Sequence, residues 1–469
     1  MNRVTLLVYM VAALGGPAGR AVAQAPADTL RMTLADAINR AQHQAVDVRV
    51  ARADVRDADG QVRQAFSGAL PQVTGTLLYT RQFSSIYSGL GGSEDSLANL
   101  FKNTPFGAAN TWNFQLQATQ LLWSGGKLGA GLKAAKSFRE AATNRQVETE
   151  SDVTLAVTQA YWDAALQRRL LTIAVDNLEQ AQQHLHQVTL FRQAGTRAEY
   201  DLLRAQVDAA NQEPLVVQAR NQLEVAVLDL KRLLNIPAEQ PVVLATALES
   251  SDEMIPVPTV DSLDNPARPG LAAAEATVRE QEQLLKVARA DYWPTLSIAT
   301  TYTQQSFPLG VSPFGAQYHQ GWNGEIRLTI PIFTGFRVGG QVDQARASLE
   351  RAQAQRDGLK QQINLEVARA WGELDRARTL LEARQQTVRQ AQRAQYLAGV
   401  RYTNGMATQL DVSDARVAAA QAEVNQVQAT RDYLVALAEL ERALGRPLPV
   451  ERKPIERVAA IPNQKEVNP

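Results

Sequence analysis

The sequence predicts a helix-dominated chain built as a tandem repeat, in which each repeat carries two amphipathic β-strands and one long coiled-coil helix. Three observations support this fold class. The sequence aligns with itself at a constant offset, two very long stretches lack proline, and several segments alternate apolar and polar residues. Composition agrees, because alanine, the best helix former, supplies about one residue in six. Long helices are therefore expected in place of a compact enzyme core.

Charge and residue usage exclude several function classes. The 469 residues include 48 Lys+Arg, 48 Asp+Glu, four His and no Cys, so the net charge is zero. A nucleic-acid partner would need a basic excess. The absence of cysteine excludes disulfides, thiol catalysis, cysteine zinc sites and a lipid anchor on an N-terminal cysteine. No nucleophile, metal or cofactor signature stands out, so we expect neither a cofactor nor enzymatic activity.

The first residues have the order of a secretory signal peptide. Arg3 precedes an apolar run from Val4 to Leu14, and the small-residue site Ala21-Val22-Ala23 follows. We therefore expect residues 1–23 to be removed by cleavage before Gln24. A helical membrane anchor is the alternative, but it needs about 18 or more apolar residues. No later stretch is long and apolar enough to span a bilayer as a helix, so the mature protein is either soluble or crosses a membrane as strands.

An internal repeat organises the rest of the chain. Residues 112–237 align with residues 322–447 at an offset of 210 without a gap, and about a quarter of the positions are identical. The matches include Trp112 with Trp322, Gly195 with Gly405, Asp201 with Asp411 and Pro237 with Pro447. Upstream the offset is 223, so the first copy carries extra residues in one Gly/Ser-rich loop. We expect a first repeat over residues 24–237, a linker over 238–266, a second repeat over 267–447 and a C-terminal tail over 448–469.

Each repeat contains a pair of half-buried strands. Trp112, Phe114, Leu116 and Ala118 alternate with polar residues, and Trp322, Ile326 and Leu328 repeat the pattern. One interpretation is two soluble β-hairpins; the other is four transmembrane strands with lipid outside and water inside. The export signal favours the second, with six aromatic residues near the strand ends at the membrane interface: Tyr79, Trp112, Trp123, Tyr302, Trp322 and Phe333.

Four strands cannot close a membrane barrel, which takes at least about eight. An open strand edge in lipid would leave backbone groups unpaired. The chain must therefore associate with copies of itself. A dimer would supply eight strands and a trimer twelve, and these arguments do not choose between them.

Two long helices are predicted over residues 127–192 and 337–402, neither of which contains proline. At 1.5 Å per residue each would be about 100 Å long. Each ends at a glycine turn, Gly195 or Gly405, from which a shorter helix returns over 196–236 or 406–446. We expect the first returning helix to stack end to end with a helix over 267–291. The second would stack with a helix over 33–67.

Several motifs occur in a specific order. They are Leu34-Ala35-Asp36-Ala37-Ile38, Ala288 to Pro294, Ile330 to Gly335, and Tyr402-Thr403-Asn404-Gly405 followed by Leu410-Asp411-Val412. With these motifs the chain resembles the outer-membrane efflux proteins, the TolC-like family, along nearly its whole mature length. The resemblance implies a homotrimer with a twelve-stranded β-barrel in the outer membrane and a long α-helical barrel in the periplasm.

The resemblance also implies a function and partners. The protein would be the outer-membrane export duct of a tripartite efflux pump or a type I secretion system. It would receive substrates from an inner-membrane transporter through a periplasmic adaptor. An equatorial domain would form from residues 238–265 and the C-terminal tail. The alternative function is a secreted periplasmic coiled-coil scaffold, which would leave the amphipathic strands unexplained.

The turns between long and short helices are the candidate sites. In TolC-like proteins the positions of Asp411 and Asp414 match acidic rings that narrow the periplasmic mouth, and Tyr402 and Asp201 match positions that link neighbouring coils. The arginine that the family carries in the second tip is Ala407 here, while Arg197 lies in the first. The resemblance thus gives a periplasmic gate of Asp411, Asp414, Tyr402, Asp201 and Arg197. The alternative is that the two acids are solvated charges in a first helical turn.

The same resemblance places adaptor docking around the two tips, at Gly195, Thr196, Gly405 and Met406. His184 and His186 lie two residues apart on a helix, so their rings point to different faces. We expect both on the solvated surface.

Overall fold

The computed structural model describes residues 29–83, 108–196, 198–248, 266–314 and 317–446. In chain order the elements are β1 (Leu30–Met32), α1 (Leu34–Gln44), α2 (Val46–Ser67), β2 (Gln72–Arg81), β3 (Asn110–Trp123), α4 (Lys127–Gln193), α5 (Glu199–Leu233), β4 (Val242–Leu244), α6 (Pro269–Ala290), β5 (Thr295–Ser306), β6 (Tyr318–Thr329), α7 (Arg337–Thr403) and α8 (Gln409–Leu444). The signal peptide predicted over 1–23, part of the linker and the C-terminal tail lie outside the described residues.

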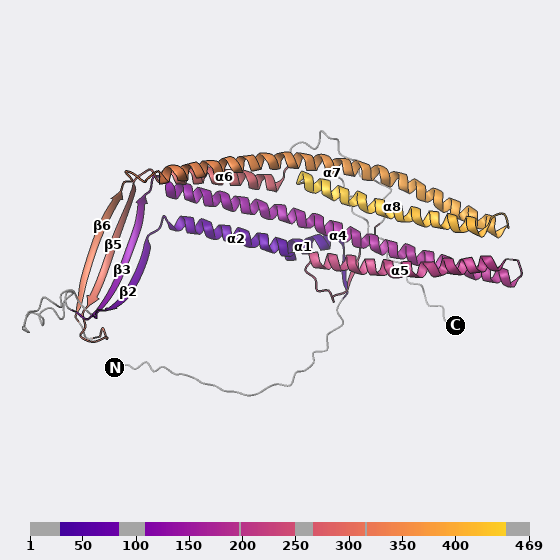
Figure 1. Cartoon of the computed structure of the whole chain (residues 1–469), viewed down its shortest axis with the longest axis horizontal. Coiled ribbons are helices and arrows are strands. Elements are labelled where there is room, and N and C mark those ends of the chain that lie inside the picture. The colour runs from indigo at the N-terminus through magenta and orange to yellow at the C-terminus, as the bar shows by residue number, and fades with distance from the viewer. Residues whose placement is uncertain (1–28, 84–107, 197, 249–265, 315–316, 447–469) are drawn as a thin grey trace, which may run out of the picture.

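Helices α4 and α7 run the length of a helical body, and a four-stranded sheet projects from one end of it (Figure 1). Each of the two helices has 67 residues, which corresponds to about 100 Å. Their bounds confirm both predicted long helices to within one residue. None of the helices in the described part of the chain combines the length and apolar composition that a membrane crossing requires.

The predicted stacking of the short helices was wrong. Helix α8, rather than α5, meets α6 end to end, since Ala267 N donates to Leu444 O at 3.0 Å. Helix α5 instead ends against α1, where Arg40 Nε donates to Leu234 O at 3.5 Å. Helix α6 lies between the two long helices and packs against both α4 and α7, whereas α2 packs against α4, so α6 continues the line of α8 and α2 with α1 continues the line of α5 (Figure 1).

The single helix predicted over 33–67 is in fact two helices. The backbone turns at Ala45, with φ −57° and ψ 142°, between α1 and α2. Thr33 and Asp36 form a capping box that starts α1. Arg52 Nη2 donates to Gln42 O at 2.7 Å, so one of the carbonyl groups freed at the end of α1 is satisfied from α2.

The two hairpins join into one antiparallel sheet in the order β2-β3-β5-β6. The central pair β3 and β5 comes from different repeats, while β2 and β6 form the two edges. The repeat is also visible in the elements themselves. Adding 223 to the bounds of α2 gives those of α6, and adding 210 to the bounds of α4 gives those of α7.

A buried hydrophobic cluster lies near the middle of the helical body, where β1 pairs in parallel with β4. Tyr161 of α4 is fully buried there. Its hydroxyl donates to Met32 O at 3.1 Å and accepts from Thr246 N at 3.0 Å. Arg168 donates to the carbonyl oxygens of Leu244 and Thr246. The long helix thus holds both strands of the small sheet.

A second junction ties four helices together through charge. Arg268, the N-cap residue of α6, is 5% exposed and pairs with Glu148 of α4 and with Glu366 of α7, the latter at 3.0 Å. Arg442 of α8 also reaches Glu366, at 2.9 Å, and Asp152 of α4, at 2.7 Å. The network therefore fixes the point where α8 ends and α6 begins against both long helices.

The charges in this network stabilise one another. Burial acts to lower the pKa of Arg268, but hydrogen bonds and charge interactions with Glu148 and Glu366 outweigh it and hold that pKa above its ordinary value. Burial acts to raise the pKa of Glu366. Hydrogen bonds from Arg268 and Gln362 and the charges of Arg268 and Arg442 hold it below its ordinary value instead.

We predict that Arg268→Met lowers the thermal unfolding midpoint of the detergent-solubilised protein. Removing the buried Arg268 leaves Glu148 and Glu366 with Arg442 as their remaining charge partner, so the loss of stability should exceed that of an exposed pair. The matched control is Arg279→Met in the same helix, whose ion pair with Glu140 is about half exposed. Exposed pairs contribute about 0–1 kcal/mol. Equal shifts of the midpoint, followed by circular dichroism, would show that the network does not hold the junction.

Candidate functional sites at the sheet face and the helical tips

One face of the sheet is apolar across all four strands. The pairing register places Tyr79 beside Trp112, Leu116 beside Tyr302, and Ile298 beside Ile326. Small and polar residues such as Thr300, Gln304 and Gln320 also lie on this face, and its large apolar residues are Val73, Leu77, Tyr79, Trp112, Phe114, Leu116, Leu296, Ile298, Tyr302, Trp322, Ile326 and Leu328. Threonine, glutamine, asparagine, arginine and glutamate predominate on the opposite face. The alternation predicted from the sequence is confirmed.

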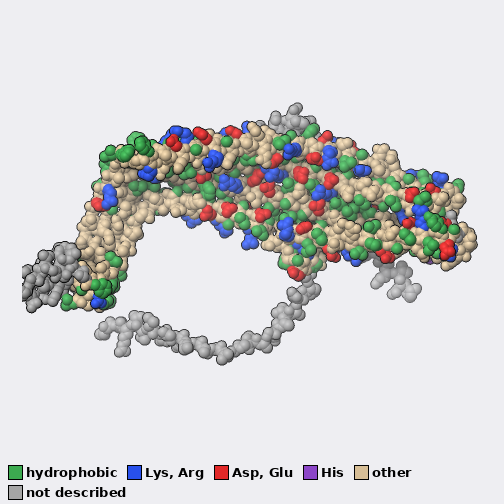
Figure 2. Space-filling view, viewed as in Figure 1, with side chains coloured by type: hydrophobic (Ala, Val, Ile, Leu, Met, Phe, Trp, Pro, Cys, Tyr) green, Lys and Arg blue, Asp and Glu red, His purple; other side chains and the backbone are tan. Residues whose placement is uncertain are grey.

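None of the other described elements covers the apolar face. Leu77 is 67% exposed, Ile326 73% and Trp322 81%. In Figure 2 the visible side of the sheet is mostly tan with apolar side chains gathered at its two ends, whereas Lys, Arg, Asp and Glu are spread over the helical body. The exposed apolar face that the pairing register defines is the kind of surface that contacts lipid or protein.

Aromatic residues lie toward both ends of this face. At the end far from the helices, Tyr79 and Trp112 pack with ring centroids 4.9 Å apart. At the helical end, Trp123 packs edge-on against Trp293 at 6.4 Å, and Phe333 packs against Phe336 at 6.0 Å. Tyr302 and Trp322 are cross-strand partners between the two ends. Sequence reasoning missed Trp293 and Phe336, because both lie outside the alternating segments.

A β-bulge in β3 brings the aromatic residues at the two ends of the strand, Trp112 and Trp123, onto the same face. The register shifts between Leu121 and Trp123, so Trp123 lies on the same face as Trp112 although their parity differs. At about 3.3 Å per residue the two indoles are about 36 Å apart along the strand. With strands tilted by about 45°, this separation spans a height of about 25 Å, the height of the apolar band of membrane strands.

At the opposite end of the molecule both helical hairpins close with the same turn. Gly195 and Gly405 have φ of 73° and 74°, a conformation that favours glycine. The next amide, of Thr196 or Met406, donates to the carbonyl oxygen five residues earlier, at 2.9 and 2.8 Å respectively. Both glycines, Thr196 and Met406 are exposed. The four predicted tip residues therefore form two equivalent, accessible turns.

Comparison with known proteins decides the family. The sequence matches the family described as outer membrane efflux protein over residues 37–235 and 265–446. The chain belongs to the outer membrane efflux protein family.

Individual proteins are similar over half or more of the chain of this efflux family member. The pyoverdine export outer membrane protein OpmQ of Pseudomonas putida is 26% identical over 87% of this chain and 84% of its own length. Protein CyaE of Bordetella pertussis is 26% identical over 56% of this chain, which spans only 55% of CyaE. The CmeC outer membrane channel of Campylobacter jejuni shares the fold, with a TM-score of 0.72 at 19% identity over 88% of this chain and 85% of CmeC.

The acidic residues of the efflux protein's tips have different surroundings. Asp411 belongs to a capping box that starts α8: Thr408 N and Oγ1 donate to its carboxylate at 2.7 and 2.8 Å. These hydrogen bonds hold the pKa of Asp411 below its ordinary value. Asp414, one turn later, is exposed. The equivalent cap position in the first tip is Ala198, which has no hydroxyl to engage Asp201.

Two further gate candidates, Tyr402 of α7 and Asp201 of α5, come from other helices than Asp411 and Asp414 of α8. Tyr402 is 3% exposed and packs against the ring of His184 of α4, with centroids 5.8 Å apart. Asp201 is half-buried at the start of α5. Arg197 lies outside the described residues.

A link between the two hairpins near the tips was not predicted. Asp208 of α5 accepts a hydrogen bond from Ser413 Oγ at 3.3 Å and pairs with Arg416 of α8 at 3.9 Å. The side chains of Arg416 and Asp208 are 12% and 24% exposed. Neither residue is matched by its repeat equivalent, Gln206 or Ala418, so the internal repeat gave no signal for it.

The prediction that His184 lies on the solvated surface was wrong, whereas His186 is exposed as expected. Nε2 of His184 is buried without a hydrogen-bond partner. Burial, followed by the charge of Arg416, holds the pKa of His184 below its ordinary value. The half-buried ring of His184 packs against Tyr402 of α7. This contact joins the two helical hairpins, so the spacing of residues within one helix could not predict it.

We predict that acid loosens the contact between His184 and Tyr402. Because the folded-state pKa is lowered, this contact is fully stabilising above the ordinary histidine pKa of about 6.5 and is lost as the pH falls below it. Amide hydrogen exchange over residues 395–404 should accelerate between about pH 7.5 and about pH 5, after correction for the intrinsic rate. His184→Leu should remove this dependence and His186→Leu should keep it. An unchanged wild-type profile would rule out the effect.

Proposed function

We propose that this protein is the outer-membrane duct of a multicomponent export system, either an efflux pump or a type I secretion system. Its substrates would come from an inner-membrane transporter through a periplasmic adaptor. The observation that carries the proposal is the apolar sheet face, which none of the described elements covers and which aromatic residues flank at both ends. Family membership supports the same conclusion, since the matching family is one of outer-membrane efflux proteins.

We further infer that three copies form the working unit. The four-stranded sheet of one chain leaves the edges β2 and β6 unpaired among the described strands. Three copies would supply twelve strands, enough to close a barrel. The helices α4 and α7 would continue the conduit for about 100 Å into the periplasm. A secreted coiled-coil scaffold, the alternative, would have to expose the apolar face to water.

Fractionation separates these two functions. We predict that the mature chain sediments with the outer membrane and is released only by detergent, because water contact with the sheet face is unfavourable. A variant with Leu77→Glu, Ile326→Glu and Leu328→Glu on the apolar face should fail to insert, since charged residues on a lipid face are destabilising. Glutamates at Thr76, Thr301 and Thr303 on the polar face are the control. Recovery of the wild-type chain in the soluble periplasm would contradict the proposal.

The helical tips suit the adaptor. Met406 is 63% exposed, and the repeat-equivalent residues Tyr200 and Leu410 are 68% and 45% exposed. These apolar side chains adjoin the two glycine turns, at the end of the body farthest from the sheet. We therefore propose Gly195, Thr196, Gly405 and Met406, together with these neighbours, as the adaptor-docking surface.

We also propose that Asp411 and Asp414 act as an acidic gate at the mouth, to which Tyr402, Asp201 and Arg197 would contribute links between coils. In a trimer the two acids would give six carboxylates, a charge ring that favours cations. The carboxylate of Asp411 already accepts two hydrogen bonds from Thr408, so we expect Asp414 to contribute more of the charge that faces passing ions.

For this gate we predict that Asp411→Ala with Asp414→Ala lowers the cation preference of single channels in planar bilayers. Asp414→Ala alone should give part of the effect without loss of the helix cap. Glu373→Ala with Asp375→Ala, two exposed acids in the middle of α7, is the control for removal of two charges per chain. Unchanged selectivity in the tip variants would leave both acids as solvated helix charges.

A further inference from the structure

One arginine lies on the otherwise uncharged apolar face of the sheet. Among the described strand residues, the face shared by Tyr79 and Trp112 carries a single Lys, Arg, Asp or Glu side chain, that of Arg81 at the end of β2. The other such strand residues, Glu325 and Arg327, lie on the opposite face and pair with each other at 2.8 Å. An arginine on a lipid face is strongly destabilising at the membrane midplane and only weakly so at the interface. The depth of Arg81 therefore decides what it meets.

Arg81 lies just beyond the aromatic residues at the end of the face that is far from the helices. Tyr79 pairs with Trp112, and Arg81 pairs with Asn110 two residues farther along β2. Two strand residues correspond to about 7 Å, or to about 5 Å in height at a tilt of about 45°. Aromatic residues of membrane proteins lie at the boundary between hydrocarbon and headgroups. In the proposed orientation, the guanidinium of Arg81 is therefore at the depth of the headgroups of the outer leaflet.

The surroundings of Arg81 leave its guanidinium available to an anion. Arg81 Cζ lies 5.6 Å from the ring centroid of Phe83, which is 90% exposed. In the described part of the chain no carboxylate pairs with Arg81. The facing Asn110 has other partners, since its Oδ1 accepts from the Tyr79 hydroxyl at 2.8 Å and its Nδ2 donates to Leu309 O at 3.1 Å. A guanidinium over an aromatic ring keeps its N–H groups, which lie in its own plane, free to donate.

Exposed apolar side chains adjoin this end of the sheet. Residues 308–314, which follow β5, are held against β3 by Asn110 and by Trp112, whose Nε1 donates to Val311 O at 2.9 Å. Leu309 is 79% exposed, Val311 54% and Phe314 88%. In Figure 2 apolar and basic side chains lie together at this end of the sheet. A ligand that combines acyl chains with a negatively charged headgroup fits such a surface.

We propose that Arg81 and Phe83, with the apolar residues 309–314, bind the lipid A moiety of lipopolysaccharide in the outer leaflet. This inference rests on the proposed function as an outer-membrane duct and adds a lipid and its site. Lipopolysaccharide makes up most of the outer leaflet of bacterial outer membranes, and its lipid A carries phosphate groups beside its acyl chains. The planar guanidinium fork matches phosphate oxygens, which makes Arg81 the residue that recognises the headgroup.

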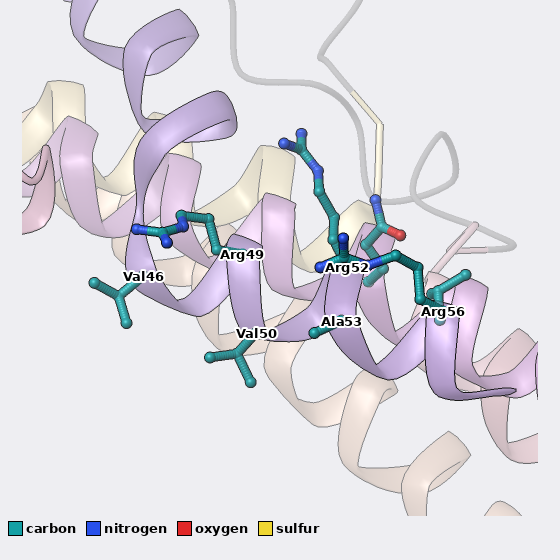
Figure 3. Close-up of a pocket in the computed structure, with 8 residues that line it drawn as sticks. Val46, Arg49, Val50, Arg52, Ala53 and Arg56 are labelled. Carbon is teal, nitrogen blue, oxygen red and sulfur yellow. The ribbon is translucent and has the colours of Figure 1, made fainter. Parts of the chain in front are cut away.

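A second basic and apolar surface supplies a control. Figure 3 shows a shallow hollow of about 610 Å³ along α2, where Val46 and Val50 lie among Arg49, Arg52 and Arg56. The hollow lies toward the start of α2, whereas β2 follows the end of that helix. It belongs to the helical body, so the outer leaflet does not reach it. Its arginines therefore test whether any exposed guanidinium beside valines binds lipid A.

Native mass spectrometry of the detergent-solubilised protein, titrated with diphosphoryl lipid A, tests the site. Arg81→Gln should weaken lipid A binding about fivefold, the effect of one basic residue near an anionic lipid surface. Glutamine suits the strand, because Gln304 is the repeat equivalent of Arg81. Phe83→Ala should weaken binding by a smaller factor. Arg327→Gln on the polar face and Arg56→Gln in the α2 hollow should bind lipid A like the wild-type chain.

The site would be refuted if Arg81→Gln and the wild-type chain bound lipid A equally. Equal binding of dephosphorylated lipid A by the wild-type chain would refute recognition of the phosphates. Equal binding of phosphatidylglycerol would overturn the assignment to lipid A, because any anionic lipid would then suffice. Failure of the proposed function gives a different result, since the wild-type chain would then be recovered from the soluble periplasm and not from the outer membrane.

Discussion

The rest of the structure depends on one physical constraint: in the described part of the chain, a four-stranded sheet has an apolar face and two strand edges that no other element covers. A strand edge exposes a row of backbone donors and acceptors, and in lipid no water can satisfy them. The apolar face requires a nonaqueous surrounding, while the open edges require more strands. Lipid and further copies of the chain together meet both needs. The duplicated architecture follows from this constraint, because one repeated unit can meet its own copy within a chain and another copy between chains.

The helical body holds the sheet and the tips apart. Near the sheet the long helices are covered by α2 and α6, and near the tips they are covered by α5 and α8 (Figure 1). Where α8 ends and α6 begins, Arg268 and Arg442 bind acids of both long helices. A buried charge network of this kind stabilises one arrangement of the helices over arrangements shifted along their axes. Any such shift would leave a buried charge without its partner. The sheet and the tips are therefore held at fixed positions relative to each other.

Much of this architecture could be predicted from periodicity. Proline-free length gave α4 and α7, alternation gave the strands and their apolar face, and self-alignment gave the repeat. The stacking of the short helices could not be predicted, because equal lengths allow α5 and α8 to exchange partners and the contacts between helix ends that decide it join residues distant in sequence. The break at Ala45 also escaped prediction, since neither proline nor glycine marks it.

The tips show where sequence reasoning ends. The glycine turns were predictable because their positive φ demands glycine at both equivalent positions. The burial of His184 against Tyr402 and the pairing of Asp208 with Arg416 were not, because they join helices distant in sequence and are absent from the other repeat. Asp411 illustrates a third case: the residue was identified, but its role in a capping box depends on Thr408, which the first tip replaces with Ala198.

The central claim is that the two free sheet edges of one chain, β2 and β6, are satisfied by the free edges of further copies of the same chain. Native mass spectrometry of the detergent-solubilised mature protein tests it most directly. The account predicts a single species with three times the mass of the mature chain, which remains intact when the detergent is diluted to just above its critical micelle concentration. A monomeric species that keeps its sheet, as judged by circular dichroism, would contradict the claim.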